Sequence, residues 1–124
     1  MTRYTPAETV RRSGFSLDTL RYYERIGLLE GVDRTAGGRR VFSDDDLGWL
    51  GLLRCLRDTG MPISAMCRFA ELARQGDETV ADRVELLEQH SVAVEAQLEL
   101  LLGQHGHLRD KITHYRALLA ADGS

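Results

Sequence analysis

A heptad repeat in the second half of the chain constrains the fold more than any other feature. Over residues 80–119, twelve positions alternate spacings of four and three residues; ten are apolar or tyrosine, and Ser91 and His105 are the exceptions. This period predicts one long helix with an apolar stripe, although Gly103 and Gly106 inside it suggest a bend or a close helix approach. One helix cannot bury such a stripe alone, so we expect a partner helix, most simply from a second copy of the chain.

The first 27 residues predict two short helices joined by a tight turn. Thr5 and Glu8 have the spacing of a capping box, so a helix should begin there and end where Gly14 breaks it. Ser16 can cap a second helix, which Gly27 ends. Two short helices around a glycine-containing turn are typical of a helix-turn-helix unit.

The next segment changes character and then returns to helix. Residues 28–42 contain three glycines between short β-prone pieces, which predicts a small hairpin, or wing. Ser43, followed by three aspartates, predicts a third helix to about Asp58. Ser64 is the expected cap of a fourth helix that ends near Gly76.

These patterns predict a mainly α fold in two parts. Residues 1–76 would form a winged helix-turn-helix domain, and residues 77–124 a dimerisation helix. No apolar run is long enough to span a bilayer, and no signal-peptide pattern is present, so we expect a cytoplasmic protein without membrane contact.

The charges of the chain are unevenly distributed. Residues 1–42 hold eight arginines and five acidic residues, a net charge of +3, whereas residues 43–124 carry a net charge of −6. A basic front and an acidic rear suit a protein that approaches a polyanion from one side. Chance clustering on a solvated surface explains the asymmetry equally well when charge is considered alone.

The second helix carries residue types suited to DNA. Arg can form two hydrogen bonds with guanine or bind phosphate, and Tyr hydroxyls usually contact phosphate. Adjacent helical residues point about 100° apart, so one of the two tyrosines can pack in the core while the other contacts DNA. Two wing arginines beside a Gly-Gly turn are suited to phosphate. The candidate DNA contacts are Ser16, Asp18, Thr19, Arg21, Tyr22, Tyr23, Arg25, Arg39 and Arg40.

Several of these segments resemble the MerR family of bacterial transcription regulators. The resemblance rests on Tyr4–Thr5, TLRYYERIGLL at 19–29, the Gly-Gly wing at 37–38, and Phe42–Asp44 with Asp46–Leu47. It covers residues 4–75, with the long helix as the family's dimerisation element.

The resemblance implies a dimer with an antiparallel coiled coil and DNA contacts from Arg21, Tyr22, Arg40 and the start of the second helix. It further implies that the dimer bends and untwists promoters whose −35 and −10 elements lie too far apart, so that RNA polymerase engages both. One departure concerns Arg39, which stands where the family usually has an aromatic residue.

A second resemblance concerns the signal. The segment around Cys55, residues 53–62, is similar to the NmlR/AdhR-like regulators that respond to aldehydes and other electrophiles, in which the matching cysteine is the proposed sensor thiol. Further matches are residues 75–79, Arg83, 86–90, Leu108, 111–112 and Tyr115. An ordinary thiol has a pKa near 8.5, so about a few per cent is thiolate at neutral pH. The competing interpretation is that Cys55 is a small buried core residue, as free cysteines often are; Cys67 matches no pattern.

Other functions have less support. The chain has no nucleophile–base pair or phosphate loop, so we expect no enzymatic activity and no cofactor. His105 and His107 point to different helix faces, and no histidines have the spacing of a helical zinc site, so we expect no metal. Two alternatives remain open: a MerR-type regulator that senses a small ligand non-covalently, and a coiled-coil interaction protein that does not read DNA.

Overall fold

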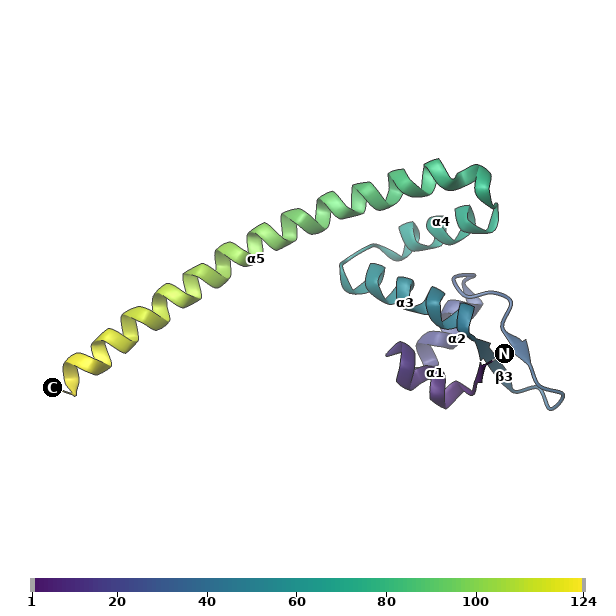
Figure 1. Ribbon diagram of the computed structural model, residues 1–124, viewed down its shortest axis with the longest axis horizontal. Helices are drawn as coiled ribbons and strands as arrows, with labels where there is room; N and C mark the ends of the chain where they lie inside the picture. Colours follow the sequence, from purple (N-terminus) through teal and green to yellow (C-terminus); the bar gives the residue numbers. More distant parts are fainter. Residues whose placement is uncertain (1, 124) are drawn as a thin grey trace. The chain divides into compact units, whose positions relative to one another are not determined.

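A computed structural model describes residues 2–123 of the protein. It confirms a mainly helical fold in which a winged helix-turn-helix is followed by one long helix (Figure 1). Two compact units can be distinguished, one ending at Leu86 and one beginning at Leu87. In chain order the elements are β1 (Arg3–Tyr4), α1 (Pro6–Ser13), α2 (Leu17–Arg25), β2 (Asp33–Arg34), β3 (Arg40–Ser43), α3 (Asp44–Asp58), α4 (Ile63–Arg74), the 3-10 turn η1 (Asp77–Thr79) and α5 (Val80–Asp122).

The first two helices begin and end as their sequence predicts. Thr5 caps α1, with a capping box in which the Thr5 hydroxyl accepts from the Glu8 amide and the Glu8 carboxylate accepts from the Thr5 amide. Gly14 closes α1 at a φ of 77°, a left-handed conformation that costs glycine little. Ser16 caps α2, and its hydroxyl accepts from the Thr19 amide at 3.1 Å.

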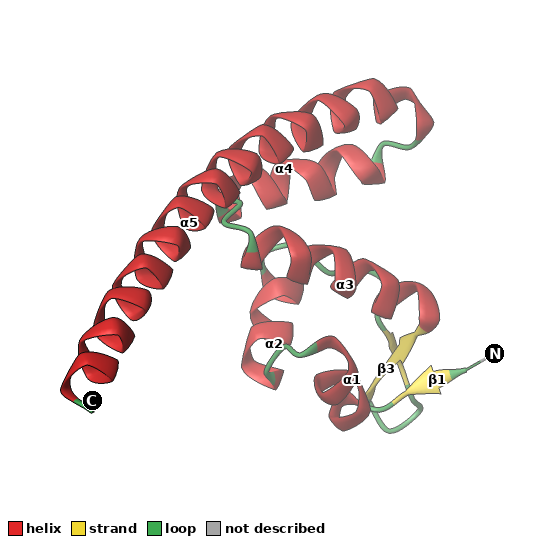
Figure 2. Cartoon of the chain, turned by 60° about the vertical axis from the view of Figure 1, so that its left-hand side comes forward, coloured by secondary structure: helices red, strands yellow, loops and turns green. Residues whose placement is uncertain are grey.

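The wing belongs to a small antiparallel sheet with strand order β1–β3–β2 (Figure 2). Tyr4 pairs with Phe42, and Arg34 pairs with Arg40. The hairpin predicted over residues 28–42 is therefore present, but the N-terminal strand was not expected. Two residues are too short to show alternation, so only pairing with β3 makes them a strand.

The third and fourth helices differ slightly from expectation. Ser43 caps α3 through a capping box with Asp46, as its sequence indicates. The prediction that Ser64 caps the fourth helix is wrong, because α4 begins at Ile63 with Pro62 as its N-cap. The Pro62 carbonyl accepts from the amides of Ala65 and Met66, which places Ser64 inside the first turn.

The core of the first unit collects apolar side chains from α2, α3, α4, β3 and the connecting segments, and α1 contributes the buried Thr9 and Ser13. The largest fully buried side chains are Phe15, Phe42, Leu20, Leu28, Leu29, Leu50, Leu53 and Met66, with Thr9 among them. At one edge the ring of Trp49 stacks on Phe69, with centroids 5.9 Å apart, and its indole N–H donates to the Leu28 carbonyl at 2.7 Å. This bond satisfies the polar group of a largely apolar ring and joins α3 to the segment after α2.

Two arginines bind the segments on either side of α2. Arg54 of α3 donates to the carbonyl of Ser13, the last residue of α1, at 3.1 Å. Arg74 of α4 donates to the Gly27 carbonyl at 2.7 Å, just after α2. Carbonyl groups at helix ends lack intrahelical partners, so these charge-assisted bonds satisfy acceptors that the turns leave open.

The long helix is present and uninterrupted. The buried Thr79 hydroxyl donates to the Leu72 carbonyl, and Arg83 donates to the Gly76 carbonyl at 2.8 Å, so the end of α4 and the start of α5 are joined. The helix continues through Gly103 and Gly106 without a break, and a Cβ at either glycine would meet no other atom within 4 Å. Within the described part of α5, no residue is buried.

The turn between α1 and α2 generates a stability prediction. A Cβ at Gly14 would lie 1.5 Å from a terminal nitrogen of Arg54, on a backbone whose φ already disfavours a side chain. We expect Gly14→Ala to lower the free energy of unfolding by roughly 1–3 kcal/mol. The matched control is Gly51→Ala, on the open surface of α3, where alanine should stabilise the helix by up to about 1 kcal/mol. Urea denaturation of both variants measures the difference, and equal stability of the two would contradict it.

Candidate nucleic-acid interface

One face of α2 carries four of the nine predicted DNA contacts. Asp18, Arg21, Tyr22 and Arg25 are all exposed, and at 100° per residue they lie within one arc of the helix. The Arg25 guanidinium lies over the Tyr22 ring, 5.6 Å from its centroid, so the two side chains present a cation beside a hydroxyl. This arrangement is suited to a polyanion, because both groups are free to face solvent.

The first residues of α2 have a local structural role as well. The Ser16 hydroxyl caps the helix and donates to the Thr19 hydroxyl at 3.0 Å. Ser16 is exposed and Thr19 half-buried at the N-terminus of α2, where helix amides favour an anion. Their candidate role in DNA contact stays a prediction.

Tyr23, also in the predicted set of DNA contacts, is buried in the structure. Its side chain is 3% exposed and packs edge-to-face on Phe15, with ring centroids 5.2 Å apart. Burial raises the pKa of the Tyr23 hydroxyl above its usual value. The ring thus lies in the core, and of the adjacent tyrosines Tyr22 is the exposed one.

The wing places arginines beside α2. Arg39 is exposed, next to a turn in which the Gly38 amide donates to the Thr35 carbonyl at 2.9 Å. Arg40 is turned toward α2 and donates from Nε to the Glu24 carboxylate at 2.6 Å. No local sequence signal indicates this ion pair, because Glu24 lies sixteen residues away in a different element.

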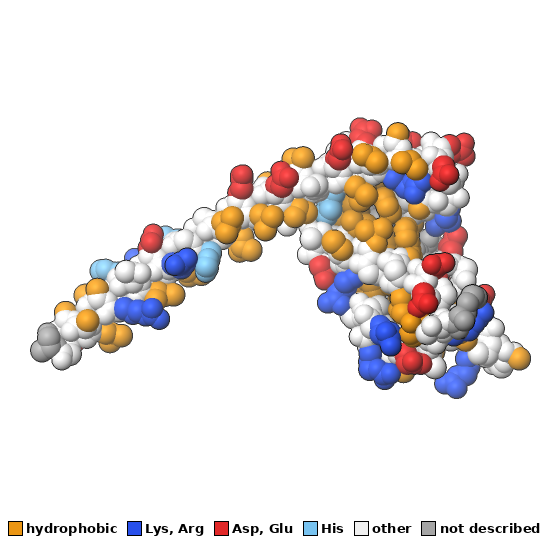
Figure 3. All heavy atoms as spheres, in the orientation of Figure 1, with side chains coloured by type: hydrophobic (Ala, Val, Ile, Leu, Met, Phe, Trp, Pro, Cys, Tyr) orange, Lys and Arg blue, Asp and Glu red, His pale blue; other side chains and the backbone are white. Residues whose placement is uncertain are grey.

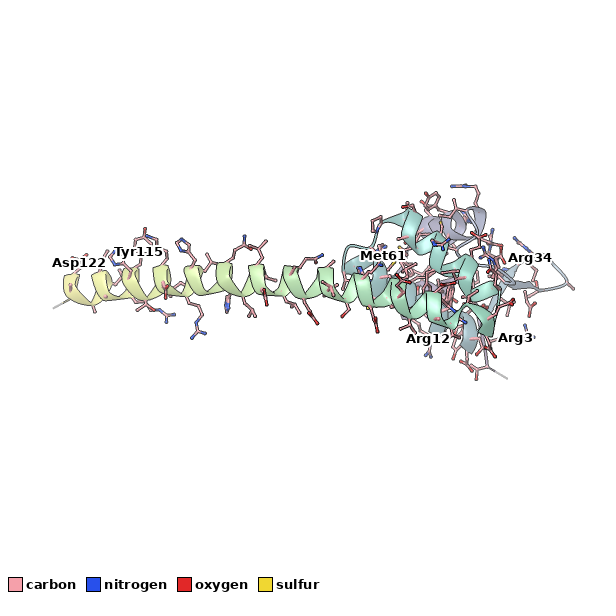
Figure 4. All side chains as sticks on the ribbon, turned by 90° about the horizontal axis from the view of Figure 1, so that it is seen from above. Arg3, Arg12, Arg34, Met61, Tyr115 and Asp122 are labelled. Carbon is pink, nitrogen blue, oxygen red and sulfur yellow. The ribbon has the colours of Figure 1, made fainter. Side chains whose placement is uncertain are left out.

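A cleft of about 170 Å³ lies where the wing meets the N-terminal strand. Arg3, Arg39 and Arg40 line it together with the start of α1. Figure 4 labels Arg3 and Arg34 near the projecting hairpin, where Arg3 also pairs with the Asp33 carboxylate at 3.2 Å. Sequence reasoning missed Arg3, because a lone arginine near the N-terminus carries no pattern of its own.

Cys55 lies on the open side of α3. Its side chain is exposed, so the interpretation of Cys55 as a buried core residue is wrong. A Cβ at Gly51, one turn earlier, would meet no atom within 4 Å, which leaves the space before the thiol open. Cys67 on α4 is half-buried.

Two arginines close to Cys55 on α3 contact the helix-turn-helix. Arg54 reaches the Ser13 carbonyl, and the Arg57 guanidinium lies over the Phe15 ring at 4.7 Å. Both arginines also hold Asp58, and the hydrogen bond from Arg54 lowers the pKa of that carboxyl below its usual value. The Asp58 carboxylate thus contacts the same guanidinium that binds the Ser13 carbonyl.

The geometry defines a winged helix-turn-helix DNA-binding protein, and comparison with known proteins agrees. Residues 4–71 match the family of MerR HTH regulatory proteins. An uncharacterized HTH-type transcriptional regulator of Haemophilus influenzae is 40% identical over 113 residues, which are 91% of this chain and 84% of that protein. The Bacillus subtilis regulator AdhR is 36% identical over 81 residues, and the match spans 65% of this chain and 58% of AdhR.

The solved structure of HiNmlR has a TM-score of 0.86 to this chain at 39% identity, covering 96% of this chain and 94% of that one. HiNmlR is a MerR family regulator that lacks the sensor domain, and its structure was determined with promoter DNA bound. The chain belongs to the MerR family of helix-turn-helix regulators and resembles its NmlR/AdhR-like members. It is a DNA-binding transcriptional regulator and not an enzyme.

Two further expectations concern membranes and metals. Among the described residues, no helix combines the length and apolar character that crossing a membrane requires. Over the same residues, no three side chains of His, Cys, Asp or Glu are gathered in a way that could hold a metal ion.

A substitution of Arg21 tests whether the exposed face of α2 contacts DNA. We expect Arg21→Ala to weaken binding to a duplex selected by the wild-type protein from a random-sequence library by roughly tenfold to a hundredfold. If Arg21 contacts a phosphate, the slope of log affinity against log salt should fall by about one. Lys111→Ala on α5 removes the same charge elsewhere and should change neither quantity. Unchanged affinity of Arg21→Ala in a fluorescence titration would contradict the assignment.

Proposed function

We propose that the protein is a homodimeric regulator that activates transcription by distorting promoters with overlong spacers, in response to thiol-reactive electrophiles such as aldehydes. The observation that carries the DNA part is the exposed cationic face of α2 beside an arginine-bearing wing. The sensing part is supported by the exposure of Cys55 on α3, the helix whose arginines contact the helix-turn-helix. The alternative of a protein that does not read DNA is contradicted by its family membership.

Promoter distortion would follow because a dimer joins two winged helix-turn-helix domains, the two reading heads, at a fixed distance. Each α2 would enter a major groove while the wing contacts the adjacent backbone, and a dimer fixes the distance between the two heads. If that distance differs from the spacing of undeformed DNA, binding favours a bent or untwisted duplex. RNA polymerase would be affected indirectly, through the altered spacing of the promoter elements.

The homodimer is supported by the surface of α5. Its apolar side chains are exposed along most of the helix and recur along its length in Figure 3; examples are Leu98, Leu101, Leu108 and Ile112, at 54%, 63%, 60% and 49% exposure. A helix with this stripe needs a partner to exclude water. An antiparallel coiled coil with the α5 of a second chain would bury it.

The coiled coil is tested with two neighbouring leucines. Leu101 lies on the heptad stripe, whereas Leu100 is exposed to the same degree but points about 100° away. We expect Leu101→Glu to shift the protein from dimer to monomer, because a buried unpaired carboxylate is costly at the seam. Leu100→Glu should stay dimeric. Sedimentation equilibrium measures the outcome, and a dimer that survives Leu101→Glu would exclude this seam.

The proposed sensing chemistry is addition of the Cys55 thiolate to an electrophilic carbon. With an α,β-unsaturated aldehyde such as acrolein, the sulfur forms a bond to the β-carbon, the double-bond electrons move to the α-carbon, and that carbon takes up a proton. The product is a thioether that contains the whole aldehyde, so no oxidant is required. Exposure of Cys55 and the open space at Gly51 support access of a small reagent.

A second candidate is a MerR-type regulator that senses a non-covalent ligand. A cavity of about 290 Å³ lies between α3 and α4, and its lining includes the Trp49 ring, Leu28, Ala70, Asp45 and Arg74. This volume is at the lower end of ligand pockets, and the mixture of an aromatic wall with charged groups suits a small polar molecule. Such a ligand would leave Cys55 unmodified.

Modification and substitution of Cys55 distinguish the covalent sensor from the sensor of a non-covalent ligand. We expect acrolein treatment of the wild-type protein to add one aldehyde mass at Cys55 in peptide mass spectrometry, and we expect Cys55→Ser to bind DNA normally but to lose the response to aldehyde in a promoter-driven transcription assay. Cys67→Ser, the matched control, should respond as wild type does. A fully responsive Cys55→Ser variant would reject the covalent sensor and favour the cavity.

A further inference from the structure

Glu24 lies between the two elements that would meet DNA, yet it is an acidic residue in the most basic part of the chain. It is on the flank of α2 that faces the wing. Its carboxylate accepts from Arg40 Nε at 2.6 Å and lies 3.6 Å from a terminal nitrogen of Arg34. One carboxylate therefore holds arginines from both strands of the hairpin, β2 and β3.

The pair formed by Glu24 and Arg40 differs from the other ion pairs at the wing. Their side chains are only 25% and 24% exposed, whereas Arg3 and Asp33 are 51% and 67% exposed. Exposed pairs contribute little because water screens them, but a short, largely buried pair restricts both side chains. The link between α2 and β3 is thus a defined contact and not a fluctuating surface pair.

The contact leaves Arg40 able to bind a second anion. A guanidinium has five N–H donors in a planar fork, and Glu24 takes only the Nε–H. Within the described residues, the Arg40 side chain donates no other hydrogen bond. Arg40 also lines the cleft between the wing and the N-terminal strand, together with Arg3 and Arg39, so three arginines gather on this side of the wing.

We propose that Glu24 is a positioning residue that sets DNA specificity by orienting Arg40 and fixing the wing relative to α2. This inference rests on the proposed binding of α2 and the wing to one duplex. The orientation allows the wing to bind phosphate only when the groove-reading face of α2 is in register with the bases.

The negative charge of Glu24 has a second consequence. It offsets one of the positive charges that attract any duplex, so it weakens binding that depends on charge alone. It also holds two arginines that could otherwise swing to whichever phosphate is nearest. Glu24 therefore lowers affinity for unrelated DNA and raises affinity for DNA of the right shape, which separates its role from that of a simple phosphate contact.

The test compares two duplexes, one selected by the wild-type protein from a random-sequence library and one of scrambled sequence and equal length. We expect Glu24→Gln to weaken binding to the selected duplex by roughly tenfold, the scale of one lost charge-assisted hydrogen bond, and to bind the scrambled duplex as tightly as wild type or more tightly. Its salt slope should not fall. Arg40→Gln should lose discrimination too, but with a salt slope lower by about one.

Three further variants make the outcome specific. Arg40→Lys keeps the charge without the Nε fork, so it should lose discrimination while keeping the salt slope. Glu71→Gln on α4 changes net charge equally and should discriminate as wild type does. The double variant Glu24→Gln with Arg40→Gln should discriminate no worse than Arg40→Gln alone. Circular dichroism confirms folding, and Arg40→Lys carries the test if Glu24→Gln does not fold.

The possible failures are distinguishable. If the wild-type protein enriches no sequence, the proposed function fails at its first step. If it does enrich one and Glu24→Gln or Arg40→Lys discriminates as well as wild type, the proposal for Glu24 is wrong. Weakening of both duplexes by the same factor would also reject it, because a general structural defect has that effect.

Discussion

Helix α2, the proposed DNA-reading helix, is flanked on both sides by carbonyls that guanidinium groups of later helices bind. Arg54 of α3 binds the carbonyl of Ser13, the last residue of α1, and Arg74 of α4 binds the Gly27 carbonyl after α2. Both carbonyls lie at or just beyond helix ends, where intrahelical partners are lacking. Helices α3 and α4 therefore support the segments on either side of α2, and the orientation of the exposed face of α2 depends on them.

Many arginines of this protein have partners within the chain. Arg54, Arg57, Arg74 and Arg83 contact carbonyls, a carboxylate or an aromatic ring. In the wing, Arg34 and Arg40 are held by Glu24, whereas Arg39 is exposed. On α2, Arg21 is exposed and Arg25 lies over the Tyr22 ring. Residues 1–42 still carry a net charge of +3. Glu24 of α2 contacts arginines from both strands of the wing.

The same support gives the proposed sensor a physical connection to the DNA-reading helix. Cys55 stands on α3 next to Arg54, which binds the Ser13 carbonyl, and two positions before Arg57, which lies over Phe15. A group added to the thiol and accommodated by a shift of α3 would displace both contacts together. Short, close-packed elements of this kind transmit small displacements, because their interiors have little free volume.

The local signals in the sequence determined most of the helices and the division into a winged domain and a long helix. Capping residues such as Thr5, Ser16 and Ser43 act through neighbours three residues away, so their effect is readable without a structure. The tertiary structure alone decided that Tyr23 is core and Tyr22 exposed, that Cys55 is accessible, and that Arg40 pairs with Glu24, sixteen residues away. These outcomes depend on which elements pack together, and contacts between distant segments leave no periodic trace in one sequence.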